Sequence, residues 1–204
     1  MNGMNSRELS AEVDGFRLAY DRDGEGPPVV LLHGWPGDRT DHRRLAPLLV
    51  EGGCEVVAPD LRGFGTSVGS APDPVQYGAD AQARSVVALI EELGLDRPVL
   101  AGYDIGSRIA QRIARDTPEL VEGLVVAPPL PGIGKRVFSE HAQAEFWYQA
   151  FHRLPVSEEL IDGRPDAVRA YLTHFWTHWS GPDFEPELDH LVEVYSVGAR
   201  SRHR

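Results

Sequence analysis

The 204-residue sequence contains one cysteine, Cys54, so no disulfide can form within the chain. The absence of disulfides fits a reducing compartment. The first ten residues are polar and lack the apolar segment of a secretory signal peptide. No apolar run approaches the ~20 residues that a helix needs to cross a bilayer. These absences predict a cytoplasmic protein that does not associate with a membrane.

Positive charge is also scarce. The chain has 20 Lys and Arg residues against 31 Asp and Glu residues, which gives a net charge of −11 at pH 7. Because recognition of phosphate backbones requires a basic face, a nucleic-acid partner is not expected. The hydrophobic content of 42% and the charged content of 25% are ordinary for a globular protein. The length allows one well-buried domain with an inserted subdomain.

Apolar runs typical of buried parallel strands alternate with amphipathic patterns over residues 1–131. The Asp14-Gly15 pair predicts a hairpin turn between short strands at 9–13 and 16–21. The runs predict strands at 29–33, 54–58, 97–103 and 121–127, and helices at 39–50, 78–93 and 105–116. Strands and helices in this alternation indicate a mostly parallel sheet with helices on both faces.

The pattern changes after Pro131, because no further apolar strand appears. Aromatic-rich amphipathic segments predict helices at 139–152, 157–160, 165–179 and 186–195. We therefore expect residues 132–197 to form a helical subdomain that covers the sheet. The last seven residues, 198–204, abandon this pattern and carry three arginines and one histidine. We expect this tail to be foreign to the fold, as a frameshift or an early stop would make it.

The segment Gly102-Tyr103-Asp104-Ile105-Gly106 matches the tight strand-to-helix elbow that presents a nucleophile, with an aspartate at its centre. The glycines allow the turn, and the following helix N-terminus favours an anion. The alternative interpretation is an ordinary turn in which Asp104 caps the helix.

Two further motifs follow the preceding predicted strands. His33-Gly34-Trp35-Pro36 comes directly after the strand at 29–33, and "PDLRGFGTS" at 59–67 follows the strand at 54–58. Each of them, taken alone, is also compatible with a simple turn-rich loop. Open parallel sheets build their sites at the carboxyl ends of their strands, where all three motifs fall.

Together the three motifs resemble the α/β-hydrolase fold, over residues 10 to about 197. The aspartate at the elbow is similar to the branch of epoxide hydrolases and haloalkane or haloacid dehalogenases. The resemblance implies a three-layer fold with a mostly parallel sheet, incomplete at the C-terminus, and a helical cap. It implies that Asp104 is the nucleophile and that the backbone N–H groups of Trp35 and Ile105 form the oxyanion hole. No cofactor and no metal are implied.

A carboxylate suits displacement at a saturated carbon, and Asp104 would open a small apolar epoxide to give an alkyl ester. "FWYQAF" at 146–151 resembles the cap segment that donates a hydrogen bond to the epoxide oxygen, so Tyr148 is the candidate donor. Alternatively, Tyr148 is an aromatic residue of the core that donates no hydrogen bond to a substrate. Halogenated substrates stay open because Trp147 and Tyr148 resemble halide-binding cap residues. Ile105 counts against both dehalogenase types, which have Trp or Arg there.

The family's later acid and histidine follow two more strands, which we do not find. No histidine after Asp104 has the expected context, so none is assigned as the base. The chain thus resembles a C-terminally truncated enzyme, and an inactive fragment that only binds a ligand or partner is the alternative. A metal site on His174 and His178, spaced i and i+4, is a weaker alternative. The strand at 121–127 would be an exposed apolar edge, so a homodimer or other association is expected.

Overall fold

The structure is a computed structural model, and it describes residues 8–127, 139–182, 185 and 188–196. The chain divides into two compact units, Met1–Pro129 and Leu130–Arg204. They are described separately below. The tail at 198–204, for which we predicted a foreign origin, lies outside the described residues.

The first unit is built on a six-stranded sheet with the order β1-β3-β5-β4-β7-β8. Strands β4, β5, β7 and β8 are parallel, and β3 and β1 add an antiparallel edge. β2 and β6 form a separate small pair. The strand bounds are β1 Glu8–Leu9, β2 Phe16–Arg17, β3 Ala19–Asp23, β4 Pro28–Leu32, β5 Glu55–Pro59, β6 Val68–Gly69, β7 Val99–Tyr103 and β8 Gly123–Ala127.

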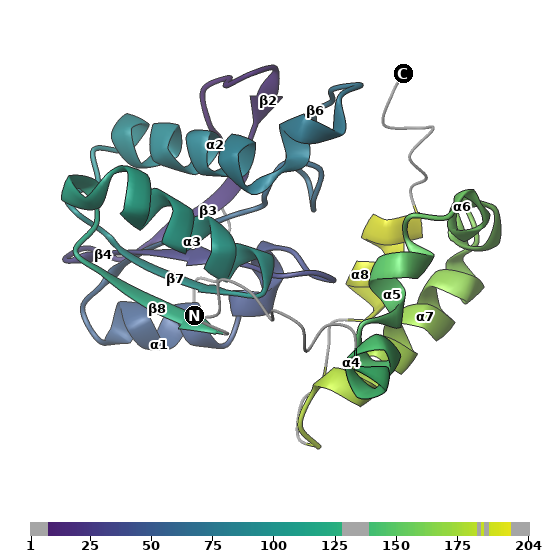
Figure 1. The fold of residues 1–204 in the computed structure, drawn as a ribbon. Helices are drawn as coiled ribbons and strands as arrows, with labels where there is room; N and C mark the ends of the chain where they lie inside the picture. Colours follow the sequence, from purple (N-terminus) through teal and green to yellow (C-terminus); the bar gives the residue numbers. More distant parts are fainter. Residues whose placement is uncertain (1–7, 128–138, 183–184, 186–187, 197–204) are drawn as a thin grey trace. The chain divides into compact units, whose positions relative to one another are not determined.

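Helices cover both faces of this sheet, as predicted. α1 (Leu45–Glu51) lies on one face, and α2 (Ala79–Glu92) and α3 (Ile105–Asp116) lie on the other (Figure 1). The alternation of side chains along β4 explains why both faces are apolar. Val30 and Leu32 belong to the core cluster beneath α2 and α3, whereas Val29 and Leu31 belong to the cluster beneath α1. The fold is therefore the three-layer α/β architecture that the sequence predicted.

The predicted helix at 39–50 is wrong as a single element. The chain instead forms a 3-10 turn, η1 (Arg39–His42), and then α1 from Leu45. Pro47 supplies the reason, because a proline has no N–H and its ring collides with the carbonyl four residues earlier. An α-helix can begin just before Pro47 but cannot run through it. Directly after the motif at 59–67 the chain forms β6, which pairs with β2.

The second unit is helical in its described part. It contains α4 (Glu140–Glu145), α5 (Trp147–Phe151), α6 (Pro155–Ile161), α7 (Pro165–Trp179) and α8 (Leu188–Ser196). The predicted helix at 139–152 is divided at Phe146, whereas α7 has the predicted bounds. α7 and α8 pack through a small core of Val168, Leu172, Leu191 and Val192. Among the helices that the structure describes, none is long and apolar enough to cross a membrane.

Candidate active site

The elbow between β7 and α3 depends on two glycines. A Cβ atom at Gly106 would collide with the carbonyl oxygens of Leu32, the last residue of the neighbouring strand β4, and of His33, which follows it. A Cβ at Gly102 would lie 2.6 Å from the Gly106 carbonyl carbon. Only glycine fits at either position, so α3 can start directly against the end of β4. This close crossing is the physical reason for the Gly-x-Asp-x-Gly pattern.

Asp104 sits at the apex of the elbow in a backbone conformation that non-glycine residues rarely adopt, with φ 49° and ψ −117°. Its N–H donates to the carbonyl oxygen of Ala127 on β8 at 2.8 Å, which holds the strained peptide in place. The side chain is exposed. Strain of this kind persists where the surrounding structure fixes it, and it is concentrated at functional sites.

The Asp104 carboxylate accepts a hydrogen bond at Oδ2 from the backbone N–H of Trp35, at 3.0 Å. It makes no side-chain capping bond to α3. Asp104 therefore occupies the N-cap position of α3, but its side chain does not cap the helix. Ile105 is the first residue of α3, so its N–H belongs to the helix terminus that lacks intrahelical acceptors. The structure thus brings Trp35, Asp104 and Ile105 together, although the oxyanion hole itself stays a prediction.

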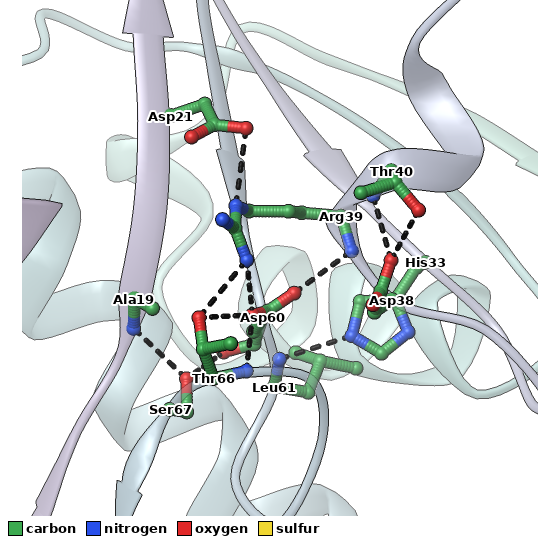
Figure 2. Close-up of polar contacts among 10 residues, drawn as sticks. All are labelled: Ala19, Asp21, His33, Asp38, Arg39, Thr40, Asp60, Leu61, Thr66 and Ser67. Carbon is green, nitrogen blue, oxygen red and sulfur yellow. Dashed lines mark hydrogen bonds and ion pairs between the residues drawn. The ribbon is translucent and has the colours of Figure 1, made fainter. Parts of the chain in front are cut away.

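The loop that carries Trp35 is fastened to the loop after β5 through the buried carboxylate of Asp60 (Figure 2). Asp60 accepts bonds from the backbone N–H and the guanidinium of Arg39, at 2.9 and 2.5 Å. It also accepts from the N–H of Thr66 at 2.7 Å. A Cβ at Gly65 would collide with this carboxylate. The "DLRGFGTS" segment therefore supports the candidate site rather than contributing a reactive group.

His33 makes the second connection between the two loops (Figure 2). Its Nε2 accepts from the N–H of Leu61 at 3.0 Å, and its Nδ1 lies 2.8 Å from the carbonyl oxygen of Gly34. This pairing fits a neutral ring protonated at Nδ1. Burial lowers the pKa of His33, which keeps the ring in that form. His33 is thus a structural histidine of the loop.

A pocket of about 470 Å³ opens beside the elbow, within the first unit. Trp35 and Ile105, the two residues that flank Asp104 in space, line it together with Phe64, Tyr77 and Arg108. Its volume is within the usual range for small-ligand sites. The lining is mainly apolar, with the Arg108 guanidinium as a polar group. Asp104 itself is not among the lining residues, although its neighbours Trp35 and Ile105 are.

The predicted cap residues lie on α5 in the second unit. The Tyr148 ring packs edge-on against Phe175, with ring centroids 5.3 Å apart, and against Trp179 at 6.3 Å. Trp147 is 38% exposed and packs against Tyr171 at 5.8 Å. The donor role of Tyr148 and the substrate-binding role of Trp147 stay predictions. The aromatic packing of Tyr148 is also what the alternative of a core aromatic requires.

The two histidines of the weaker metal alternative are stacked on α7, with ring centroids 6.3 Å apart. His178 Nε2 lies 2.7 Å from a carboxylate oxygen of Glu145 on α4. Within the described ranges, no group of three or more His, Cys, Asp or Glu side chains is placed to hold a metal ion. The His174 and His178 pair therefore has no third ligand within the described ranges. His178 instead forms a hydrogen bond that links α7 to α4.

Two features near the elbow were missed in the sequence. The Tyr103 hydroxyl donates to Asp41 Oδ2 at 2.5 Å, a contact between distant segments that no local pattern indicates. Arg108 lines the pocket four residues after Asp104, and this one could have been found. Residues i and i+4 share a helix face, so a residue at that spacing in α3 points the same way as the elbow.

The three-layer α/β fold carries Asp104 on a strained elbow, beside the backbone N–H of Trp35. This combination points to one class of protein. The alpha/beta hydrolase fold family matches residues 27–180, and the chain belongs to it. The resemblance found in the three motifs is confirmed.

Particular relatives include epoxide hydrolases and a dehalogenase. The chain is 38% identical over 180 residues to the soluble epoxide hydrolase of Corynebacterium sp. (strain C12), covering 87% of this chain and 52% of that protein. It is 35% identical over 170 residues to the fluoroacetate dehalogenase of Burkholderia sp., covering 80% and 55%. The solved structure of the epoxide hydrolase CorEH superimposes with a TM-score of 0.82 at 30% identity, covering 97% and 70%. The chain thus spans about half the length of these curated relatives.

Proposed function

We propose that the protein is a hydrolase of the epoxide hydrolase type in which Asp104 attacks an epoxide carbon. The observation that carries this proposal is the Asp104 carboxylate itself, exposed on a strained elbow and bonded to the Trp35 N–H at 3.0 Å. A carboxylate nucleophile needs no base to begin, because it is already an anion at neutral pH. The epoxide hydrolases among the relatives support the choice of substrate class.

The first step forms a bond between an Asp104 oxygen and an epoxide carbon while the ring carbon–oxygen bond breaks. The electron pair of that bond goes to the ring oxygen, which takes a proton from the Tyr148 hydroxyl. Water then attacks the ester carbonyl carbon, and the N–H groups of Trp35 and Ile105 stabilise the oxyanion. In a complete enzyme, collapse would release the diol and restore the carboxylate with one water consumed. Of the two protons of that water, one goes to the released alkoxide oxygen and the other returns to the Tyr148 oxygen. The base that activates this water is not assigned to any residue of the chain.

The cap contribution rests on sequence resemblance and on the aromatic surroundings of α5. We propose that Tyr148 is the proton donor and that Trp147 contacts the apolar part of the substrate. A phenol suits the role, because it is neutral at pH 7 and loses its proton only to a developing alkoxide. Small apolar substrates and a cytoplasmic location, which the single cysteine favours, are parts of the same proposal.

The proposal is tested by intact-mass spectrometry after incubation with styrene oxide. We expect a single adduct on the wild-type chain, located at Asp104, and no adduct on Asp104→Asn. Asp96→Asn, which removes another exposed carboxylate, is the matched control and should be alkylated like the wild type. Without an assigned base, the ester should accumulate instead of turning over. A wild-type chain that stays unmodified would favour a fragment that only binds ligands.

A haloacid dehalogenase-like activity is the second candidate, and Arg108 is the observation that favours it. Arg108 is exposed, lines the pocket and lies one helical turn after Asp104. Within the part of the chain that the structure describes, no carboxylate forms an ion pair with its guanidinium. A substrate carboxylate would provide such a partner. Asp104 would then displace the halide from the adjacent carbon and leave the same kind of ester.

A further inference from the structure

Tyr103 directly precedes the proposed nucleophile, and its hydroxyl donates to Oδ2 of Asp41 at 2.5 Å. Asp41 lies in η1, on the same segment as Trp35 and a few residues after it. The other end of that segment is held by the bond from the Trp35 N–H to Asp104. Two consecutive residues of the elbow thus form hydrogen bonds to this segment, Tyr103 at Asp41 and Asp104 at Trp35.

The fit between the Tyr103 ring and this segment leaves no room for side chains. A Cβ at Gly34 would collide with the Tyr103 ring and lie 3.0 Å from the Cβ of Asp104. A Cβ at Gly37 would collide with the Asp41 carboxylate and lie 3.1 Å from the Tyr103 hydroxyl oxygen. Because the backbone itself touches the ring, a displacement of Tyr103 moves the peptide that carries the Trp35 N–H.

The Tyr103–Asp41 bond is partly buried. The buried ring of His42 packs edge-on against Tyr103, with ring centroids 6.3 Å apart. Burial is also the main cause that raises the pKa of Asp41 to about 7. In such surroundings a hydrogen bond is stronger than in water, and its loss leaves a polar group without compensation.

We infer that Asp41 and Tyr103 are positioning residues that keep the Trp35 N–H at hydrogen-bond distance from the Asp104 carboxylate. The inference rests on the proposed function and deepens it, because neither side chain contacts the reacting atoms. In the alkylation step charge leaves the Asp104 oxygens, so there the Trp35 N–H acts by holding the carboxylate in one orientation for attack, and it stabilises an oxyanion only when water attacks the ester. A displacement of about 1 Å in such a group can cost about 100-fold in rate.

The test compares Tyr103→Phe with the wild type by two measurements. The first is the hydrogen-exchange rate of the Trp35 amide, followed by NMR. The second is the rate of Asp104 alkylation by styrene oxide. Loss of the Tyr103–Asp41 bond should accelerate the exchange by about tenfold. It should also slow the alkylation by about tenfold, because the Asp104 carboxylate is then less well oriented. Amide exchange at the centre of α2 should not change, which separates a local effect from general destabilisation.

Variants of Asp41 provide a second route and a rescue. Asp41→Asn keeps an oxygen that accepts the Tyr103 bond, so it should stay close to the wild type in both measurements. Asp41→Ala removes the acceptor and should reproduce the effect of Tyr103→Phe. The matched control is Tyr20→Phe on β3, which breaks another tyrosine–carboxylate bond, to Glu8 of β1 at 2.7 Å. It should leave the Trp35 amide and the alkylation rate unchanged.

The outcomes separate this inference from the proposed function. An unchanged Trp35 exchange rate in Tyr103→Phe overturns the inference, whatever the alkylation shows. If Tyr103→Phe does not fold, the same measurement on Asp41→Ala decides. Absence of any adduct on the wild type overturns the proposed function, while the exchange rates still test the inference. Faster exchange without slower alkylation also contradicts it, because the N–H would then not orient the Asp104 carboxylate for attack.

Discussion

The backbone N–H of Trp35 donates to Oδ2 of Asp104 across 69 positions of sequence. The contact exists because β4 and β7 are parallel neighbours that end at the same edge, with Leu32 paired to Gly102. The Trp35 loop leaves one strand and the elbow leaves the other. A carboxylate and a backbone donor therefore meet in the folded protein before any substrate is bound, which is the preorganisation that oxyanion stabilisation requires.

Replacing Gly106 by alanine should damage this arrangement. The new Cβ would collide with backbone carbonyl oxygens of Leu32 and His33, which cannot move away as a side chain could. We expect the free energy of unfolding to fall by about 3 kcal/mol, at the upper end of overpacking effects, and Asp104 alkylation to be lost. Urea denaturation and intact-mass spectrometry measure the two effects. Gly123→Ala on β8 is the control, because nothing lies within 4 Å of its Cβ position.

Arg108 should distinguish between the two candidate substrate classes. If it binds a substrate carboxylate, Arg108→Gln should slow alkylation of Asp104 by chloroacetate by about tenfold or more, as expected for a lost charged hydrogen bond. Alkylation by neutral styrene oxide should be nearly unchanged. Arg112→Gln is the control, because Arg112 lies on the same helix but pairs with Asp80 at 2.9 Å. Equal effects on both reagents would contradict a carboxylate-binding role.

The core of the fold could be predicted because its elements have local patterns. The sequence shows the apolar runs of β4, β5, β7 and β8 and the helical period of α3 directly. The predicted hairpin turn is also confirmed, because Asp14 and Gly15 both have positive φ, which such a turn requires. The single helix predicted at 39–50 is wrong because the amphipathic pattern was followed through Pro47. In the structure the α-helix begins only at Leu45, two residues before the proline.

The candidate site was predictable only where a motif encodes it. Asp104 and Trp35 stand in motifs whose glycines have a steric cause, so their proximity followed from the strand order. The Tyr103–Asp41 bond and the Asp60 network join residues that no periodicity relates, and their geometry depends on the finished packing of two loops. Tertiary contacts of this kind cannot be inferred from spacing along the chain.

Strand β8 should make this 204-residue chain associate. β8 pairs with β7, and no other strand in the described ranges covers its second edge. Val125 is 64% exposed and Leu124 is 39% exposed. We expect dimers or larger species in sedimentation velocity, and Val125→Lys should shift them toward monomer because charge blocks pairing of edges. Val75→Lys, at a residue 71% exposed outside this edge, should change nothing. A monodisperse wild-type monomer would contradict the prediction.

Asp41 and His42 are neighbours whose ionisation should affect stability in opposite directions. Burial raises the pKa of Asp41 from 3.8 to about 7, and burial lowers the pKa of His42 from 6.5 to about 4. The stability contributed by a protonated Asp41 is complete below its unfolded pKa and is lost as the pH rises through 7. The stability linked to a neutral His42 is complete above pH 6.5 and is lost as the pH falls through 4. Between pH 4 and 6.5 the contributions of Asp41 and His42 to the pH dependence of the free energy of unfolding therefore cancel.

Replacing either residue should therefore leave only the other one's contribution to the pH dependence of the free energy of unfolding. At about 1.4 kcal/mol per pKa unit, Asp41→Asn should become more stable relative to the wild type by roughly 4 kcal/mol as the pH rises from 4 to 7. His42→Phe, which keeps an aromatic ring against Tyr103, should gain roughly 3 kcal/mol relative to the wild type as the pH falls from 6.5 to 4. Urea denaturation at intervals of half a pH unit measures both differences. Asp96→Asn, at an exposed carboxylate, is the control. Parallel stability curves for the variants and the wild type would show that neither group is as buried as its contacts imply.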